Sequence, residues 1–189
     1  MNPVETFNEW MEEARAAGVQ VPEAMTLATA DSEGRPSARM LLLKGANEDG
    51  FMFFSGYESR KGRELDANPR AALVFYWRPL GRQVRVEGPV QRLPPEASDA
   101  YWRTRPPRSR AAAAASLQST PIDDLGALEA EAERLLAEHG GEVPRPQRWG
   151  GYLLEPEAIE FWQHRDDRLH NRIRFTRARE GWRAQRLAP

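Results

Sequence analysis

The feature that most constrains this chain is a change in hydrophobic period after Gly18. Before it, Phe7, Trp10 and Ala14 recur at helical spacing, which predicts an amphipathic helix within residues 1–18. After it, short runs that alternate apolar and polar residues are separated by tight turns. Strands joined in this way pair with their chain neighbours. The sequence therefore predicts a mainly β fold, an antiparallel barrel or sandwich with peripheral helices.

The predicted strands share this alternation and are bounded by Gly, Pro, Asn or Asp. They cover residues 25–29, 39–44, 51–55, 71–77, 83–93, 150–155, 159–163, 172–177 and 182–187. Helices are predicted after Ser59, over residues 95–105 and over residues 122–139, the last being acidic. Residues 106–121, which include the alanine tract 111–115, are predicted to be irregular. No shift in composition marks a boundary, so we expect residues 1–189 to form one domain.

The composition excludes several kinds of chemistry. The chain has no cysteine, which rules out thiol nucleophiles, disulfides, iron–sulfur clusters and thiolate zinc sites. It has three histidines, and we expect no metal site. No apolar run approaches the ~20 residues of a membrane span, and the first residues lack a signal-peptide pattern, so a cytoplasmic protein is expected. Phosphate-loop, dinucleotide-binding and nucleophile-elbow motifs are also missing from the sequence.

The basic residues are almost all arginine, Lys44 and Lys61 being the exceptions, and they concentrate toward the C-terminus. Arginine suits phosphate and carboxylate groups and stacks on rings. A basic C-terminal segment at residues 164–189 also raises nucleic-acid binding as an alternative. The formal net charge of −1 argues against it, because such binding depends on excess positive charge.

Two polar clusters have the composition of phosphate sites. Residues 59–61, Ser-Arg-Lys, combine the free amides of a helix start with two cations. Tyr101, Arg105 and Ser109 follow at intervals of four, which would place a phenol, a guanidinium and a hydroxyl along one helix face and its exit. By spacing alone, a solvated helix cap and an ordinary surface helix are the commoner explanations of these residues.

A third cluster contains a titratable group. On a strand, Arg168, His170 and Arg172 would share one face and place two cations around an imidazole. A strand edge with exposed arginines is the simpler alternative.

Taken in order and at their intervals, these segments closely resemble the pyridoxine/pyridoxamine 5′-phosphate oxidase family, from about residue 7 to residue 189. The stretches that carry the resemblance are RMLLLK (39–44), SRKGREL (59–65), NPRAALVFYW (68–77), RQVRVEG (82–88), SDAYWRTRPPRS (98–109), QS (118–119), VPRPQRWGG (143–151), EFWQ (160–163), RLHNR (168–172) and RLAP (186–189).

The resemblance implies a Greek-key split barrel that binds FMN at the interface of a homodimer. It implies oxidation of pyridoxamine and pyridoxine 5′-phosphates to pyridoxal 5′-phosphate, with O₂ reduced to hydrogen peroxide. The residues it assigns to the flavin are Arg39, Met40, Leu41, Leu42, Leu43, Lys44, Phe54, Ser55, Arg60, Lys61, Gln83, Gln118, Ser119, Trp162 and Arg172. Those it assigns to the substrate are Lys44, Tyr101, Arg105, Ser109, Arg168 and His170, of which Arg168 and His170 would be catalytic, over the pyridine ring.

The chain departs from the family pattern in three places. Residues 1–6 do not match the family's basic leading segment, residues 110–114 replace Gln-Ile-Gly-Ala-Trp with Arg and alanines, and Asn171 replaces an Asp. We expect residues 110–116 to form a mobile loop that orders around a phosphate. The alternative is that Trp102 fills the space of the missing Trp. The alternative functions are a phenazine-pathway flavin oxidase on the same barrel, and an FMN- or PLP-binding protein with little turnover.

Overall fold

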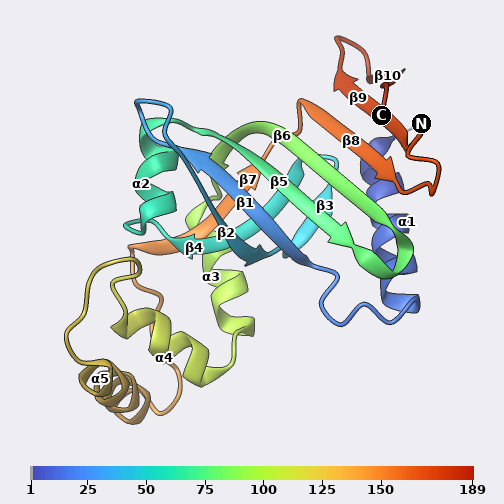
Figure 1. The fold of residues 1–189 in the computed structure, drawn as a ribbon. Helices are drawn as coiled ribbons and strands as arrows, with labels where there is room; N and C mark the ends of the chain where they lie inside the picture. Colours follow the sequence, from blue (N-terminus) through green and yellow to red (C-terminus); the bar gives the residue numbers. More distant parts are fainter. Residues whose placement is uncertain (1) are drawn as a thin grey trace.

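The computed structural model describes residues 2–189 and shows a strongly curled antiparallel sheet with helices at both ends (Figure 1). Its strands are β1 (Ala24–Ala30), β2 (Pro36–Leu42), β3 (Gly45–Asn47), β4 (Gly50–Gly56), β5 (Arg70–Trp77), β6 (Arg82–Arg92), β7 (Trp149–Leu154), β8 (Ala158–Gln163), β9 (Asn171–Arg177) and β10 (Trp182–Arg186). The predicted class, a mainly β antiparallel split barrel with peripheral helices, is confirmed. Three-residue β3 is the one strand that the hydrophobic pattern missed.

Strand β6 joins the two parts of the sheet. Along one edge it pairs with β5, which leads on to β1 and β2. Along the other edge, residues 82–87 pair with β8, which leads to β9 and β10, whereas residues 90–92 pair with β7, which leads to β4 and β3. Gly88 lies where the partner changes, and a Cβ there would be 1.9 Å from the carbonyl oxygen of Glu155. The sheet therefore divides at Gly88, where the backbone of Glu155 passes too close to leave room for a side chain.

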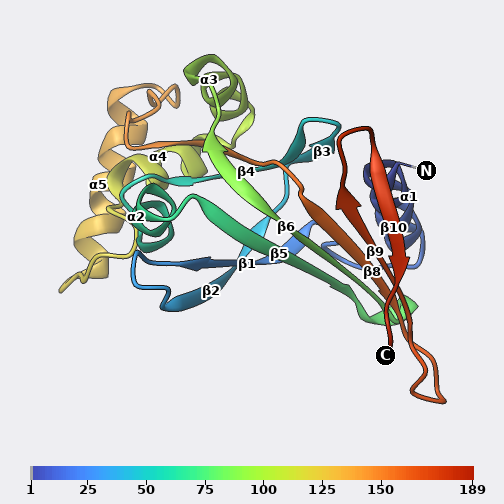
Figure 2. The same ribbon diagram turned by 90° about the horizontal axis from the view of Figure 1, so that it is seen from above.

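The helices are α1 (Pro3–Ala16), α2 (Arg60–Ala67), α3 (Pro95–Thr104), α4 (Pro107–Ala115) and α5 (Leu125–Glu138), with a 3-10 turn at Arg78–Leu80. Helix α1 closes one end of the barrel, since Phe7 is fully buried with its ring centroid 4.9 Å from that of Phe51 and 4.8 Å from that of Phe75. Seen from above, α2, α4 and α5 lie at the other end, away from β8, β9 and β10 (Figure 2). Across residues 2–189 we find no helix of the length and apolar character that crossing a membrane requires.

The prediction that residues 106–121 are irregular is wrong, because residues 107–115 form helix α4. The helix begins with Pro at its first turn and continues through alanine, the residue with the highest helix propensity. A helix is predicted from a periodic apolar stripe, and an alanine tract has no such stripe. Arg110 and Ala111 are buried, so α4 packs against the protein. Trp102 is also buried and packs against Trp149, with ring centroids 4.8 Å apart.

The face predicted for Arg168, His170 and Arg172 is likewise wrong. Strand β9 begins at Asn171, and the preceding residues form a turn in which Arg168 has a left-handed φ of 63°. Only Arg172 of the three lies on a strand. The predicted strand 39–44 also ends early, at Leu42, because the amide of Lys44 donates to Met52 O at 2.8 Å and the chain turns toward β4.

Candidate functional site

A large pocket opens at the end of the sheet that α3, α4 and α5 cover, with a volume of about 1140 Å³. Its lining comes from the ends of β2 and β4, from α3 and α4, and from one side of α5. The predicted site residues that line it are Met40, Leu41, Leu42, Lys44, Phe54, Ser55, Tyr101, Arg105, Ser109 and Gln118. Segments more than sixty residues apart in the chain thus meet in one cavity.

One wall of the pocket is aromatic. Phe54 stacks on Tyr101, with ring centroids 3.9 Å apart at 19°, and Trp149 lies parallel to Phe54 at 5.7 Å. The ammonium of Lys44 lies 5.8 Å from the centroid of the Tyr101 ring. Flat rings beside a cation suit a planar, anionic ligand.

Arg105 is a half-buried cation in this pocket, and no acidic residue among residues 2–189 pairs with it. Its guanidinium carbon is 4.6 Å from the Trp149 ring centroid, and one terminal nitrogen donates to Ser109 O at 3.0 Å. The other terminal nitrogen, Nη1, is buried and finds no hydrogen-bond acceptor within residues 2–189. Burial lowers the pKa of Arg105, against the opposing influence of Tyr101. A guanidinium with a buried, unused donor favours an anion in the pocket, because charge-assisted hydrogen bonds offset the desolvation of that donor.

A second cationic group lies beside the pocket, at the start of α2. Ser59 caps this helix as predicted, its hydroxyl accepting from the amide of Gly62 at 3.3 Å. The ammonium of Lys61 is buried and donates to Ser55 Oγ at 3.0 Å, Ser59 Oγ at 3.1 Å and Gln118 Oε1 at 3.1 Å. Burial, followed by the charge of Arg39, lowers the pKa of Lys61 to about 8. Three neutral acceptors leave this ammonium short of negative charge.

The other predicted flavin residues at the pocket end of the sheet lie in different environments. Arg39 and Arg60 both donate to Glu64, a buried carboxylate on α2. The side chain of Leu43 belongs to the hydrophobic core and not to the pocket wall. Ser119 follows Gln118 in a left-handed conformation, with φ of 71°. Ser119 and Arg168 are the two non-glycine residues of 2–189 with positive φ, and such strained backbone concentrates at functional sites.

The other predicted residues form a separate cluster on β6, β8 and β9. Gln83 is the cross-strand neighbour of Trp162, which in turn neighbours Arg172. The His170 ring is 4.7 Å from the Trp162 ring, between centroids. None of these residues, nor Arg168, contributes to the pocket wall. Figures 1 and 2 both show β8 and β9 at the end of the sheet away from α4 and α5.

Sequence reasoning missed three residues of this region. Trp149 and Arg148 line the pocket, and both belong to the PQRWGG stretch, which was noted only as part of a pattern. Glu64 contacts two predicted flavin residues. Its signal was available, since an eight-residue helix with Leu65 as its one large apolar residue must turn charged side chains toward the sheet.

Two family descriptions match the sequence. Residues 11–138 match the family described as pyridoxamine 5′-phosphate oxidase, and residues 149–189 match the pyridoxine 5′-phosphate oxidase C-terminal dimerisation region. A curated relative from Paraburkholderia phymatum, named pyridoxine/pyridoxamine 5′-phosphate oxidase, is 52% identical over 100% of this chain and 89% of its own length. A relative of the same name from Herminiimonas arsenicoxydans is 50% identical, over 100% of this chain and 90% of its own.

Two solved structures resemble the fold across the whole chain. PhzG from Burkholderia lata 383, crystallised in complex with tetrahydrophenazine-1-carboxylic acid, matches with a TM-score of 0.96 and 38% identity, covering 100% of this chain and 93% of that one. A pyridoxamine 5′-phosphate oxidase-related, FMN-binding protein from Nostoc punctiforme matches with a TM-score of 0.80, covering 100% of this chain and 99% of that one. At 20% identity, the second shows the fold alone.

Proposed function

The chain belongs to the pyridoxamine 5′-phosphate oxidase family of flavin-type oxidoreductases, and from this premise we propose that it oxidises pyridoxamine and pyridoxine 5′-phosphates to pyridoxal 5′-phosphate. The observation that carries the proposal is Arg105, a half-buried guanidinium whose Nη1 is a buried, unused donor in an aromatic pocket. Such a site suits a flat ring that bears a phosphate.

The phosphate would be held by four groups of the pocket wall. Lys44 and Arg105 supply charge, and Tyr101 and Ser109 supply hydroxyl donors. A phosphate monoester carries close to two negative charges near neutral pH, so burying it requires several charged or hydroxyl donors. Arg105 is prepared for this role, because Ser109 O and the rings beside it already fix its guanidinium plane.

FMN is the proposed cofactor, and it supplies hydride acceptance from the substrate and electron transfer to O₂. The residues at the start of α2 fit its phosphate: Lys61 has hydroxyl and amide partners only, and Arg39 and Arg60 lie on the same carboxylate nearby. Three cations around one carboxylate leave an excess of positive charge that a phosphate would offset.

We propose that each active site is shared between two chains, because five of the predicted site residues form a cluster outside the pocket. They are Gln83, Trp162, Arg168, His170 and Arg172. The C-terminal region that matches a dimerisation region includes all of these residues except Gln83. In a symmetric dimer, this cluster of one chain would face the pocket of its partner. There Arg168 and His170 would orient the substrate ring, which requires no protein nucleophile.

A second candidate function is oxidation of a larger ring acid, favoured by the 38% identity to PhzG. The small side chains of Ala112 and Ala113 in the pocket wall leave room for such a ligand. Against this, the four polar groups of the pocket wall, Arg105 included, exceed what one carboxylate requires.

Activity assays separate these functions. Purified protein is expected to be a yellow homodimer with FMN bound to each chain, and to consume O₂ with either phosphorylated vitamer faster than with tetrahydrophenazine-1-carboxylic acid. The reverse preference would favour the second function, and a protein with flavin but no turnover of any of these would be a binding protein. A colourless monomer that does not bind added FMN would contradict the proposed function altogether.

Mixed dimers test the shared site. Arg105→Met and His170→Ala each remove one cluster's contribution, so each homodimer is expected to be nearly inactive at substrate concentrations far below the KM of the parent. A mixed dimer of the two should recover about half of the activity, because one of its two sites then holds both intact clusters. The matched control mixes Arg105→Met with Lys44→Met, which affect the same cluster and should recover nothing.

A further inference from the structure

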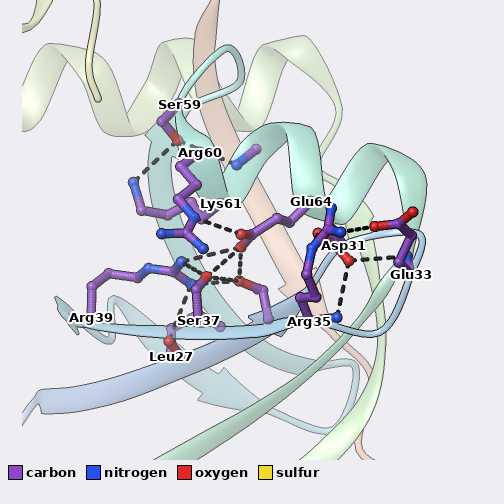
Figure 3. A network of polar contacts seen from close by, with 12 residues as sticks. Leu27, Asp31, Glu33, Arg35, Ser37, Arg39, Ser59, Arg60, Lys61 and Glu64 are labelled. Carbon is purple, nitrogen blue, oxygen red and sulfur yellow. Dashed lines mark hydrogen bonds and ion pairs between the residues drawn. The ribbon is translucent and has the colours of Figure 1, made fainter. Parts of the chain in front are cut away.

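Glu64 is a buried carboxylate that no part of the proposed reaction uses. It projects from α2 toward β1 and β2, and its side chain is 7% exposed (Figure 3). Its Oε2 accepts from Thr29 Oγ1 at 2.5 Å, from Ser37 Oγ at 2.6 Å and from Arg39 Nη2 at 3.2 Å. Its Oε1 accepts from Arg60 Nε at 2.9 Å. Two hydroxyls and two guanidinium groups thus converge on one side chain.

The contacts fix the orientation of Arg39. One terminal nitrogen of its guanidinium donates to Thr29 Oγ1 at 2.6 Å and to Leu27 O at 3.3 Å. The other donates to Ser37 Oγ and to Glu64. Glu64 therefore acts on Arg39 in two ways. It accepts a hydrogen bond from Arg39 directly, and it orients the Thr29 and Ser37 hydroxyls, to which Arg39 also donates.

The same carboxylate fixes only the inner end of the Arg60 side chain. Arg60 is 62% exposed, and its Nε is the atom that bonds to Glu64. Its terminal nitrogens make no hydrogen bond within residues 2–189, so they can bind a ligand. Arg39 and Lys61 are close enough that the charge of Arg39 lowers the pKa of Lys61, while Glu64 raises it. One acid thus lies among three cations.

We propose that Glu64 is a positioning residue that holds Arg39 and Arg60 in the arrangement that binds the flavin phosphate. The inference rests on the proposed function, since it takes FMN as the ligand of this cluster. Glu64 itself does not touch the ligand; it acts through the two arginines. A carboxylate lowers the attraction of the cluster for any anion, so its contribution must come from geometry rather than from charge.

Charge and geometry predict opposite results for Glu64→Gln. If charge dominated, removing the carboxylate would leave more positive charge and tighten FMN binding. If position dominates, the amide of Gln can accept at one end only and turns its NH2 group toward a guanidinium, which is a donor only, so at least one of the two arginines loses its fixed orientation. We expect FMN affinity of the apoprotein to fall about tenfold to a hundredfold, the range of one or two charge-assisted hydrogen bonds.

The experiment measures the binding of FMN and of riboflavin to apoprotein by quenching of flavin fluorescence. Glu64→Gln and Glu64→Asp are compared with the parent; the second keeps the charge but is too short to reach both arginines. Asp66→Asn is the matched control, because it removes one negative charge from the same helix at an exposed residue that pairs with Arg92 instead. Both Glu64 variants should lose FMN affinity but keep riboflavin affinity, and the control should match the parent.

Tighter FMN binding by Glu64→Gln, or parent-like binding by Glu64→Asp, would overturn the proposal. Equal losses for FMN and riboflavin would also overturn it, since they indicate general damage to the fold. The Nε–H resonance of Arg39 in NMR spectra of the apoprotein gives a readout that needs no flavin. It should be sharp in the parent and broadened in Glu64→Gln. A parent that binds no flavin would contradict the proposed function, and an unchanged Arg39 resonance would contradict the role of Glu64.

Discussion

Replacing Lys61 with Met is expected to stabilise the apoprotein while weakening its hold on FMN. Burial lowers the pKa of Lys61 from its ordinary 10.5 to about 8. At roughly 1.4 kcal/mol per pH unit, this difference corresponds to about 3 kcal/mol of folding free energy that the protonated side chain costs at pH 7. The substitution should remove that cost, because Met has similar length and no charge.

The size of this stability gain depends on pH. Below pH 8 both the folded and the unfolded chain hold the proton, so the full cost is present. Between pH 8 and 10.5 only the unfolded chain holds it, and the folded state gains stability as pH rises. Above 10.5 neither state is protonated. The stability gain of Lys61→Met should therefore be largest at pH 7 and shrink to nothing near pH 10.5.

The neighbours of Lys61 permit a clean comparison. After the substitution, Ser55 Oγ still donates to Gln118 Oε1 at 3.1 Å, and Ser59 Oγ still donates to Gly56 O at 2.7 Å. Urea unfolding of parent and variant apoprotein, at one protein concentration and several pH values, measures the difference while other titrating groups cancel. Parallel stability curves across pH 7 to 10.5 would refute the reasoning, since Lys61 would then not be the group that titrates.

Three further predictions concern other charged groups. Burial raises the pKa of Glu64, but hydrogen bonds from Ser37, Thr29, Arg60 and Arg39 outweigh it and hold this pKa near 2. The lowered pKa contributes about 3 kcal/mol of stability above pH 4.5, which should be lost as the pH falls toward 2. Acid unfolding of Glu64→Gln should lack that loss. Arg105→Met should raise KM for pyridoxamine 5′-phosphate about tenfold to a hundredfold with FMN affinity unchanged, whereas exposed Arg108→Met should alter neither value. Amides of α4 should be protected from hydrogen exchange without any ligand. Glu142→Ala removes the ion partner of buried Arg110 and should reduce that protection by about 1 kcal/mol. Rapid exchange in the parent would instead support the mobile loop expected from the sequence.

The strands were predictable from sequence because their signal is local. A period of two between turn residues identifies each strand regardless of its partners, as in β1, where Met25, Leu27 and Thr29 are the buried residues. Helix α4 was not predictable in this way. An alanine tract is compatible with a helix or a loop, and the contacts of α4 are long-range, as the ion pair between Arg110 and Glu142, thirty-two residues apart in sequence, shows.

The candidate site was predictable as a set of residues but not as an arrangement. Tyr101, Arg105 and Ser109 do line one cavity, but Tyr101 belongs to α3, Arg105 follows the end of that helix and Ser109 belongs to α4. The spacing of Arg168 and His170 suggested a shared strand face, whereas a left-handed residue turns the chain there. Glu64 shows the general limit: its contacts run to β1 and β2, and no spacing within its own helix encodes them.

The double pairing of β6 has a consequence for how the chain could be divided. The two regions that match family descriptions are separated by residues 139–148, which include the exposed Gly140. A cut there would look like a cut between domains, yet both β7 and β8 from the second piece pair with β6 of the first. Each fragment alone would present unpaired strand edges, which promote aggregation. We therefore expect the halves to be insoluble when expressed separately and to assemble when produced together, as the two parts of a split reporter do.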